Sequence, residues 1–405
     1  MAVGVAPAQN FFSVDGIRLA AVAANIRYKE RPDLVLIEIA AGSVVSGVFT
    51  QNAFCAAPVI VARNHLAQRS SQFFLINTGN ANAGTGETGE TDALRCCNAV
   101  ADLAGNESWQ VLPFSTGVIG EKLPVERIIN SLPNAFQKLT DSNWGLAAQG
   151  ILTTDTRPKL SSAQVSIDDQ VVTITGLAKG AGMIKPNMAT MLSYVFTDAC
   201  IDQKSLDGFL REAVNLSFNR LTVDGDTSTN DCCMLTATGL SGVMISDIED
   251  DACQKFKEAL LGVFLELATN LIKDAEGATK FVTVEVNQGK DEQECLQVAY
   301  CIAESPLVKT ALFASDPNWG RILAAVGRAG LEDLDIDSVK IYLGETQIVA
   351  AGARAPGYRE ELGQLEMNQE EIAIRIDLAR GSHSERVWTS DLSHDYVRIN
   401  AEYRT

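Results

Sequence analysis

Four short segments of this chain are rich in hydroxyl, amide and glycine groups, which are the groups that commonly form polar sites. They cover residues 77–85, 115–120, 179–190 and 224–231. The last segment, DGDTSTND, holds three Asp and three hydroxyl residues within eight positions. It lacks the regular Asp spacing and closing Glu of a calcium loop, so calcium is a poor fit. We interpret it as a buried polar scaffold, with a metal or substrate site as the alternative.

Histidine is too scarce to supply the usual catalytic base. The chain has three histidines, His65, His383 and His394, and none has a partner at metal-ligand spacing. We therefore expect neither a histidine triad nor a zinc hydrolase, and we predict no metal site. The nine cysteines are odd in number and contain no C-x-x-C pair. We expect reduced, buried thiols rather than a disulfide framework.

The loop at residues 84–89, GTGETG, formally matches a dinucleotide-binding pattern between a strand and a helix. Glu87 and Glu90 would repel a pyrophosphate, and nothing upstream resembles the first strand of a doubly wound sheet. A lone match of this kind is weak evidence. We therefore expect no bound cofactor.

The charge balance limits the kinds of partner. The chain carries 51 acidic and 33 basic side chains, which leave a net charge of −18 at pH 7. Such a surface repels nucleic acid and anionic membranes, so neither is an expected partner. The N-terminal residues lack a signal-peptide pattern, and no run approaches the ~18 apolar residues of a membrane span. We expect a cytoplasmic protein that acts on a cationic or zwitterionic small molecule.

The elements that must position these polar segments indicate an α/β fold. Aromatic residues make up 6% of the chain, and small aliphatic residues dominate, which suits a mixed α/β protein. Strands are expected at residues 34–50, 58–63, 111–120, 170–175 and 281–286. Helices are expected at residues 91–105, 205–220 and 251–273. Thr91 or Asp92 is the predicted N-cap of the first helix.

The helix predicted at residues 251–273 has the clearest pattern, because Phe256, Leu260, Val263 and Leu267 fall on one face. After residue 290 the sequence changes to alternating β segments, such as 340–352 and 370–381. We place a domain boundary near residue 285. The prediction is a main domain at 1–284 and a smaller α+β domain at 285–405.

One segment carries a specific resemblance. KGAGMIKPNMATMLSYVFTDA, at residues 179–199, resembles the autocleavage region of the ornithine acetyltransferase family, which includes the bifunctional glutamate N-acetyltransferase. The resemblance extends over essentially the whole chain, where eight other blocks occur in the order expected of that family: SGVFTQNAFCAAPV, INTGNANAGTG, STGVIG, TTDTRPK, VDGDTSTND, DAEGATKFVTV, DPNWGRI and YVRINAEYRT. An ordered series of blocks is more specific than one motif. The single departure is Gly84, where relatives often carry Cys, and we do not expect it to alter the chemistry.

The resemblance implies a layered, self-cleaving fold whose catalytic residue is an N-terminal threonine. Thr190 Oγ would attack the carbonyl of Ala189, and water would open the resulting ester to leave chains 1–189 and 190–405. The freed α-amine of Thr190 has a reference pKa of about 7.7–8.0, so it could take the proton from its own hydroxyl. This amine would supply the base that the scarce histidines do not.

The resemblance also assigns the remaining site residues. The hydroxyl of Thr116 and the backbone N–H of Gly117 would stabilise the oxyanion. Substrate contacts carry over to Thr153, Lys179, Thr190, Glu276, Asn400 and Thr405. Lys179 suits a substrate carboxylate, and Glu276 suits the side-chain ammonium of ornithine.

The implied reaction is a ping-pong transfer. Thr190 would take acetyl from N-acetylornithine, release ornithine and pass the acetyl group to glutamate, and bifunctional members also use acetyl-CoA as co-substrate. The family assembles as a heterotetramer of two cleaved α and two cleaved β chains. Two rival hypotheses are a self-cleaving amidohydrolase or aminopeptidase that uses water as acceptor, and a non-enzymatic protein that binds acetylated amino acids.

Overall fold

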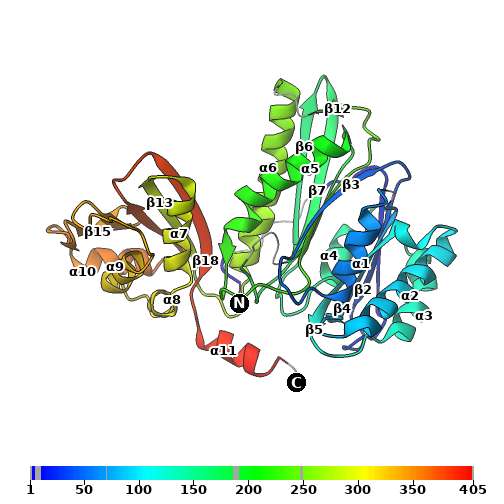
Figure 1. Ribbon diagram of the computed structural model, residues 1–405, viewed down its shortest axis with the longest axis horizontal. Coiled ribbons are helices and arrows are strands. Elements are labelled where there is room, and N and C mark those ends of the chain that lie inside the picture. Colours follow the sequence, from blue (N-terminus) through cyan, green and yellow to red (C-terminus); the bar gives the residue numbers. More distant parts are fainter. Residues whose placement is uncertain (1, 5–10, 70, 186–190, 247–249, 404–405) are drawn as a thin grey trace.

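The computed structural model describes residues 2–4, 11–69, 71–185, 191–246 and 250–403. Within these ranges the strands form sheets of four, five and seven strands and one two-stranded pair. Figure 1 shows the seven-stranded sheet in a C-terminal lobe, coloured yellow to red, beside a body that holds the other sheets. The α/β class predicted from the sequence is confirmed.

The five-stranded sheet forms the centre of the body. Its strand order is β3 (Val44–Phe49), β11 (Cys232–Ala237), β8 (Leu192–Thr197), β7 (Gln170–Lys179) and β6 (Lys159–Ile167). Only the β8–β11 pair is parallel among these strands. One face is covered by α5 (Gln203–Leu216) and α6 (Asp251–Lys273).

Helix α6 has the bounds that its periodicity predicted. The Asp250 carboxylate accepts a hydrogen bond from the Cys253 N–H at 2.8 Å and so caps the first turn. Phe256, Leu260 and Val263 are buried against the sheet. The Asp250 cap and the buried apolar face both favour a helix over these residues, so the local and the tertiary interactions stabilise the same element.

The four-stranded sheet lies against the opposite face of the five-stranded sheet. Its order is β1 (Ile17–Val22), β2 (Leu34–Ile39), β4 (Phe73–Asn80) and β5 (Val111–Val118). Phe74 and Phe114 from this sheet contact Tyr194 from the other across the shared core. Helices α2 (Gly86–Ala104) and α3 (Val125–Gln137) cover the outer face, so the body has a helix–sheet–sheet–helix arrangement.

Two local predictions in this region are wrong. Residues 58–63 form part of α1 (Ala57–Leu66) rather than a strand. Pro58 lies in the first helical turn, where its missing N–H costs nothing, and burial of Val59 and Ala62 outweighs the β preference of the valines. Helix α2 begins at Gly86 with Thr85 as its N-cap, upstream of Thr91 and Asp92.

The C-terminal lobe is built on the seven-stranded sheet. Its order is β10 (Leu221–Thr222), β18 (His383–Ser390), β13 (Phe281–Gly289), β17 (Glu371–Asp377), β14 (Lys340–Leu343), β15 (Thr346–Ala350) and β16 (Ala353–Arg354). Its helices are α7 (Glu292–Ala303), α8 (Pro306–Phe313), α9 (Trp319–Gly327) and α10 (Glu360–Met367). The expectation of β segments directly after residue 290 is therefore wrong for 292–327. Strand β13 runs across residue 285, where we predicted the domain boundary.

The remaining elements connect the layers. They are α4 (Trp144–Gly150), the 3-10 turns η1 (Ser108–Gln110) and η2 (Phe218–Arg220), the strand pair β9 (Cys200–Ile201) and β12 (Met244–Ile245), and α11 (His394–Ala401). Figure 1 shows α11, in red, leaving the C-terminal lobe and returning beneath the body. Across the described residues no helix has the length and apolar character to span a membrane.

Candidate active site

A cavity of about 250 Å³ is lined by residues from both sheets of the body and from α11. Every predicted site residue that the structure describes lines it: Thr116, Gly117, Thr153, Lys179, Glu276 and Asn400. They come from β5, the loop after α4, the end of β7, the turn after α6, and α11. Ala189, Thr190 and Thr405 lie outside the described residues, so their roles stay predictions.

Lys179 ends β7 and lies between two hydroxyl groups. Its Nζ donates to Thr116 Oγ1 at 3.1 Å and to Thr153 Oγ1 at 3.0 Å. Burial lowers the pKa of Lys179, and the nearby Asp155 carboxylate opposes that shift. An ammonium framed by hydroxyls at the wall of a cavity is suited to a carboxylate ligand.

Gly117 occupies a position that only glycine fits. Its φ is +134°, and a Cβ there would lie 2.3 Å from the carbonyl carbon of Gly79 on the neighbouring strand. The close approach of β5 to β4 places Thr116 and Gly117 together at the cavity wall.

Glu276 is one of two acidic side chains in the cavity wall, and the other is the buried Asp231. Its N–H donates to the Ala181 carbonyl at 2.8 Å, and Asn400 Nδ2 donates to its Oε2 at 2.7 Å. A Cβ on Gly182 would lie 2.5 Å from the same Oε2, so glycine at that position leaves room for the carboxylate. The contact with Asn400 joins α11 to the cavity wall.

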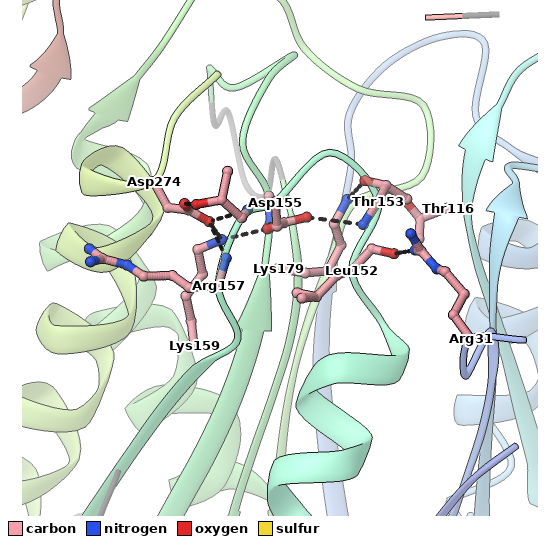
Figure 2. A network of polar contacts seen from close by, with 11 residues as sticks. Arg31, Thr116, Leu152, Thr153, Asp155, Arg157, Lys159, Lys179 and Asp274 are labelled. Carbon is pink, nitrogen blue, oxygen red and sulfur yellow. Dashed lines mark hydrogen bonds and ion pairs between the residues drawn. The ribbon is translucent and has the colours of Figure 1, made fainter. Parts of the chain in front are cut away.

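Behind the cavity lies a charge network that the sequence interpretation missed. Lys159 Nζ donates to Asp155 Oδ1 at 2.5 Å and to Asp274 Oδ2 at 2.6 Å. Figure 2 shows Asp155 between Lys159 and Thr153, with Asp274 on the far side of the lysine. The side chains of the three charged residues are at most 1% exposed. TTDTRPK and DAEGATK contain all three residues, but the resemblance assigned roles only to Thr153 and Glu276 within those blocks.

The network holds Asp155 in its charged form. Burial raises the pKa of Asp155, but the positive charges of Lys159 and Lys179 outweigh it and bring the pKa well below the usual range. Asp155 also accepts a hydrogen bond from the Gly180 N–H at 2.7 Å. The carboxylate therefore places a fixed negative charge beside the buried lysines.

The DGDTSTND segment supports the same cavity by hydrogen bonds to backbone groups. Asp224 accepts from the Met183 N–H at 2.7 Å and from the Tyr396 hydroxyl at 3.2 Å. Asn230 donates to the carbonyl oxygens of Ala81 and Ser115 at 2.6 and 2.9 Å. Of this segment only Asn230 and Asp231 are buried, and residues 228–231 line the cavity, so the segment is partly a scaffold and partly cavity wall. In the described part of the chain no cluster of three or more metal-ligating side chains occurs.

The fold and the cavity together define an α/β protein with a cavity whose walls carry charged and polar groups. A cation and a carboxylate line the same small space, with hydroxyl and glycine backbone groups beside the cation. Sites of this kind, with few polar groups in a largely preformed cavity, are typical of enzymes for small metabolites.

Comparison with known proteins assigns the family. Residues 18–405 match the model described as the ArgJ family. A protein of Pseudomonas fluorescens (strain Pf0-1) named arginine biosynthesis bifunctional protein ArgJ is 54% identical over the full length of both chains. A Psychrobacter arcticus protein of the same name is 55% identical, also over all of both chains. The chain belongs to the ArgJ family, which confirms the resemblance stated from the sequence.

A solved structure supports the same assignment. The crystal structure of arginine biosynthesis bifunctional protein ArgJ from Bacillus halodurans is 39% identical to the matched part of this chain. The match covers 52% of this chain and 99% of that chain, with a TM-score of 0.50.

Proposed function

We propose that this protein transfers acetyl from N-acetylornithine to glutamate, and from acetyl-CoA to glutamate, after cleavage between Ala189 and Thr190. The observation that carries the proposal is the cavity of an ArgJ-family chain in which Lys179 and Glu276 present opposite charges. N-acetylornithine carries a carboxylate and a side-chain ammonium, so one group complements each wall. The relatives' names place them in arginine biosynthesis and call them bifunctional, which favours two acetyl donors.

The chemistry proceeds in two transfers. Thr190 Oγ attacks the acetyl carbonyl of N-acetylornithine, the amide C–N bond breaks, and the ornithine amine leaves with a proton. The α-amine of Thr190 takes the hydroxyl proton and returns it to the leaving amine. Glutamate's amine then attacks the acetyl ester, and the bond between the acetyl carbon and Thr190 Oγ breaks. The α-amine of Thr190 moves a proton from the attacking nitrogen to Oγ, which yields N-acetylglutamate and restores the hydroxyl.

Thr116 and Gly117 serve both transfers. Each transfer develops a negative charge on the acetyl oxygen, which a hydroxyl and a backbone N–H at the cavity wall can stabilise. Lys179 lies within hydrogen-bond distance of Thr116 Oγ1, so its positive charge favours the hydroxyl proton pointing into the cavity.

Product analysis with purified protein tests the proposal. Incubation with N-acetylornithine and glutamate is expected to yield N-acetylglutamate and ornithine, and intact mass spectrometry is expected to show a chain beginning at Thr190 that gains one acetyl group. An amidohydrolase would instead release acetate, and a binding protein would release no product. The Thr190→Ala variant is expected to remain uncleaved and inactive. Cleavage after Ala189 in that variant would refute the assignment of the nucleophile.

The pH profile tests the base separately. The α-amine must be neutral to take the proton, so activity is expected to rise as pH increases through its reference pKa of about 7.7–8.0. A flat profile from about pH 6 to 9 would exclude the α-amine as the base.

The proposal extends to assembly and location. We propose a cytoplasmic heterotetramer of two α and two β chains. Native mass spectrometry of cleaved protein is expected to find four chains of two kinds.

A further inference from the structure

The charge network of Lys159, Asp155 and Asp274 lies outside the cavity lining but joins the segments that form it. The ammonium of Lys159 contacts one oxygen of each carboxylate, and the three side chains are almost completely buried. In the antiparallel β6–β7 pair Lys159 faces Ala178, so it lies beside the strand end that carries Lys179. Lys159 is thus near the substrate residues without contacting the cavity.

On one side of the network, Asp155 contacts the part of the cavity wall that carries Lys179. Its Oδ2 accepts from the Thr153 N–H at 3.1 Å, and its Oδ1 accepts from the Gly180 N–H at 2.7 Å. These hydrogen bonds fix the backbone of Thr153, as Figure 2 shows, and the backbone of Gly180, the residue after Lys179. The position of Asp155 therefore determines where the carboxylate-binding groups lie.

On the other side of the network, Asp274 lies at the start of the turn that carries Glu276. Asp274 follows the last residue of α6 and precedes Glu276 by two positions. Its carboxylate accepts from the Thr156 N–H at 3.0 Å and from the Thr156 hydroxyl, so it is tied to the same loop as Asp155. Movement of Asp274 would displace the turn that carries Glu276.

Building on the proposed function, we propose that Lys159 is a positioning residue that sets the separation between Lys179 and Glu276. This separation selects the side-chain length of the acetylated diamino acid that the cavity accepts. Removing the ammonium would leave two buried carboxylates facing one another without their shared partner, which drives them apart or protonates one of them. Either response would allow the loop that carries Asp155 and Thr156 to move, and the distance between Lys179 and Glu276 would then no longer be fixed.

The test is a change in selectivity. Rates of acetyl transfer to glutamate are measured with N-acetylornithine and with homologues whose side chain is one methylene shorter or longer, N²-acetyl-2,4-diaminobutyrate and N²-acetyllysine. One methylene in a fitted site changes kcat/KM by roughly 10–200-fold, so the unaltered protein is expected to discriminate within that range. Lys159→Met is expected to reduce this discrimination at least roughly tenfold, mainly by raising the KM for N-acetylornithine.

Two further variants separate positioning from general damage. Lys309→Met removes another almost fully buried lysine, one that lies in the C-terminal lobe, and is expected to leave the discrimination unchanged. Asp274→Asn keeps the side-chain volume while weakening the contact with Lys159, and it decides the question if Lys159→Met does not fold. Because discrimination is a ratio of rates, a smaller folded fraction does not alter it.

Each outcome has a distinct meaning. The positioning role is supported if Lys159→Met or Asp274→Asn discriminates less between the three substrates. Intact mass spectrometry must also show that the variant is cleaved as fully as the unaltered protein. Unchanged selectivity in the variants that fold overturns it. Absence of acetyl transfer in the unaltered protein overturns the proposed function itself, and so is distinguishable from failure of this inference.

Discussion

Two regions of the molecule bury a lysine, and they satisfy it in different ways. Beside the cavity, Lys159 contacts two carboxylates, whereas Lys309 of the C-terminal lobe donates to the Thr389 hydroxyl and to the Ser390 carbonyl. The exposed fractions are 2% for Lys159 and 3% for Lys309. The carboxylate partners of Lys159 join separate segments of the chain, whereas the groups that accept hydrogen bonds from Lys309 are neutral. Burial lowers the pKa of Lys309 to about 8.

The largest expected contrast is in stability. Lys159→Met leaves two buried carboxylates without their cation, so it is expected to lower the free energy of unfolding by about 3–5 kcal/mol. Lys309→Met leaves two neutral hydrogen-bond acceptors unpaired and removes the attraction to the nearby Asp391 carboxylate, so its expected cost is about 1–3 kcal/mol. Urea unfolding of both variants measures the difference. Equal losses would show that the two kinds of partner are energetically equivalent here.

A second contrast concerns the hydroxyls that accept from buried lysines. Thr116→Ala removes the proposed oxyanion donor beside Lys179, so kcat is expected to fall roughly 10²–10³-fold. Thr389→Ala removes the corresponding hydroxyl beside Lys309 and is expected to leave kcat unchanged. Steady-state rates on fully cleaved protein provide the measurement. A similar loss in both variants would assign the Thr116 effect to folding rather than to catalysis.

The pH dependence of stability sharpens the same comparison. The pKa of Lys309 is about 8 in the folded chain, so the unfolded chain binds more protons between that value and the reference of about 10.4. The stability of the unaltered protein relative to Lys309→Met is therefore expected to rise across this window. The pKa of Asp155 is lowered on folding, so stability relative to Asp155→Asn is expected to fall as pH drops below about 3.9. Urea midpoints at several pH values test both directions, and a pH-independent difference for either pair would contradict them.

The smallest effect is expected at a lysine that is not buried. Lys185 forms an ion pair with Glu304 at 3.0 Å, and their side chains are 39% and 22% exposed. Solvent screens such a pair, so Lys185→Ala is expected to change the free energy of unfolding by less than about 1 kcal/mol. If Lys185→Ala lowered the free energy of unfolding as much as Lys159→Met is expected to, the exposure of a lysine would not determine how much its ion pair stabilises the fold.

Elements with consistent local signals were predictable from the sequence. The apolar face and the acidic cap of α6 lie within the helix or next to it, so no distant contact is needed to define it. Helix α1 was not predictable in this way, because its β-branched residues favour a strand until their burial between the sheets is known. The helices at 292–327 were not predicted, because the β character of residues 340–381 was extended to the whole region after residue 290.

The site residues show the same division. The resemblance named six described residues that line one cavity, including Asn400 near the C-terminus. It did not name Asp155, Lys159 or Asp274, and none of these three residues lines the cavity. These three residues matter because they contact one another. The sequence around each of them has no pattern that indicates such a contact.

By itself the sequence determined the family, the chemistry of the groups available and the helices whose caps and apolar faces agree. It also argued against a histidine base, since none of the three histidines has a partner at metal-ligand spacing. Only the tertiary structure decided which charges meet. Lys159 and Asp274 are 115 positions apart, and their contact depends on the packing of α6 against β6. Charge pairing across such a separation depends on how whole elements pack, which no short stretch of sequence specifies.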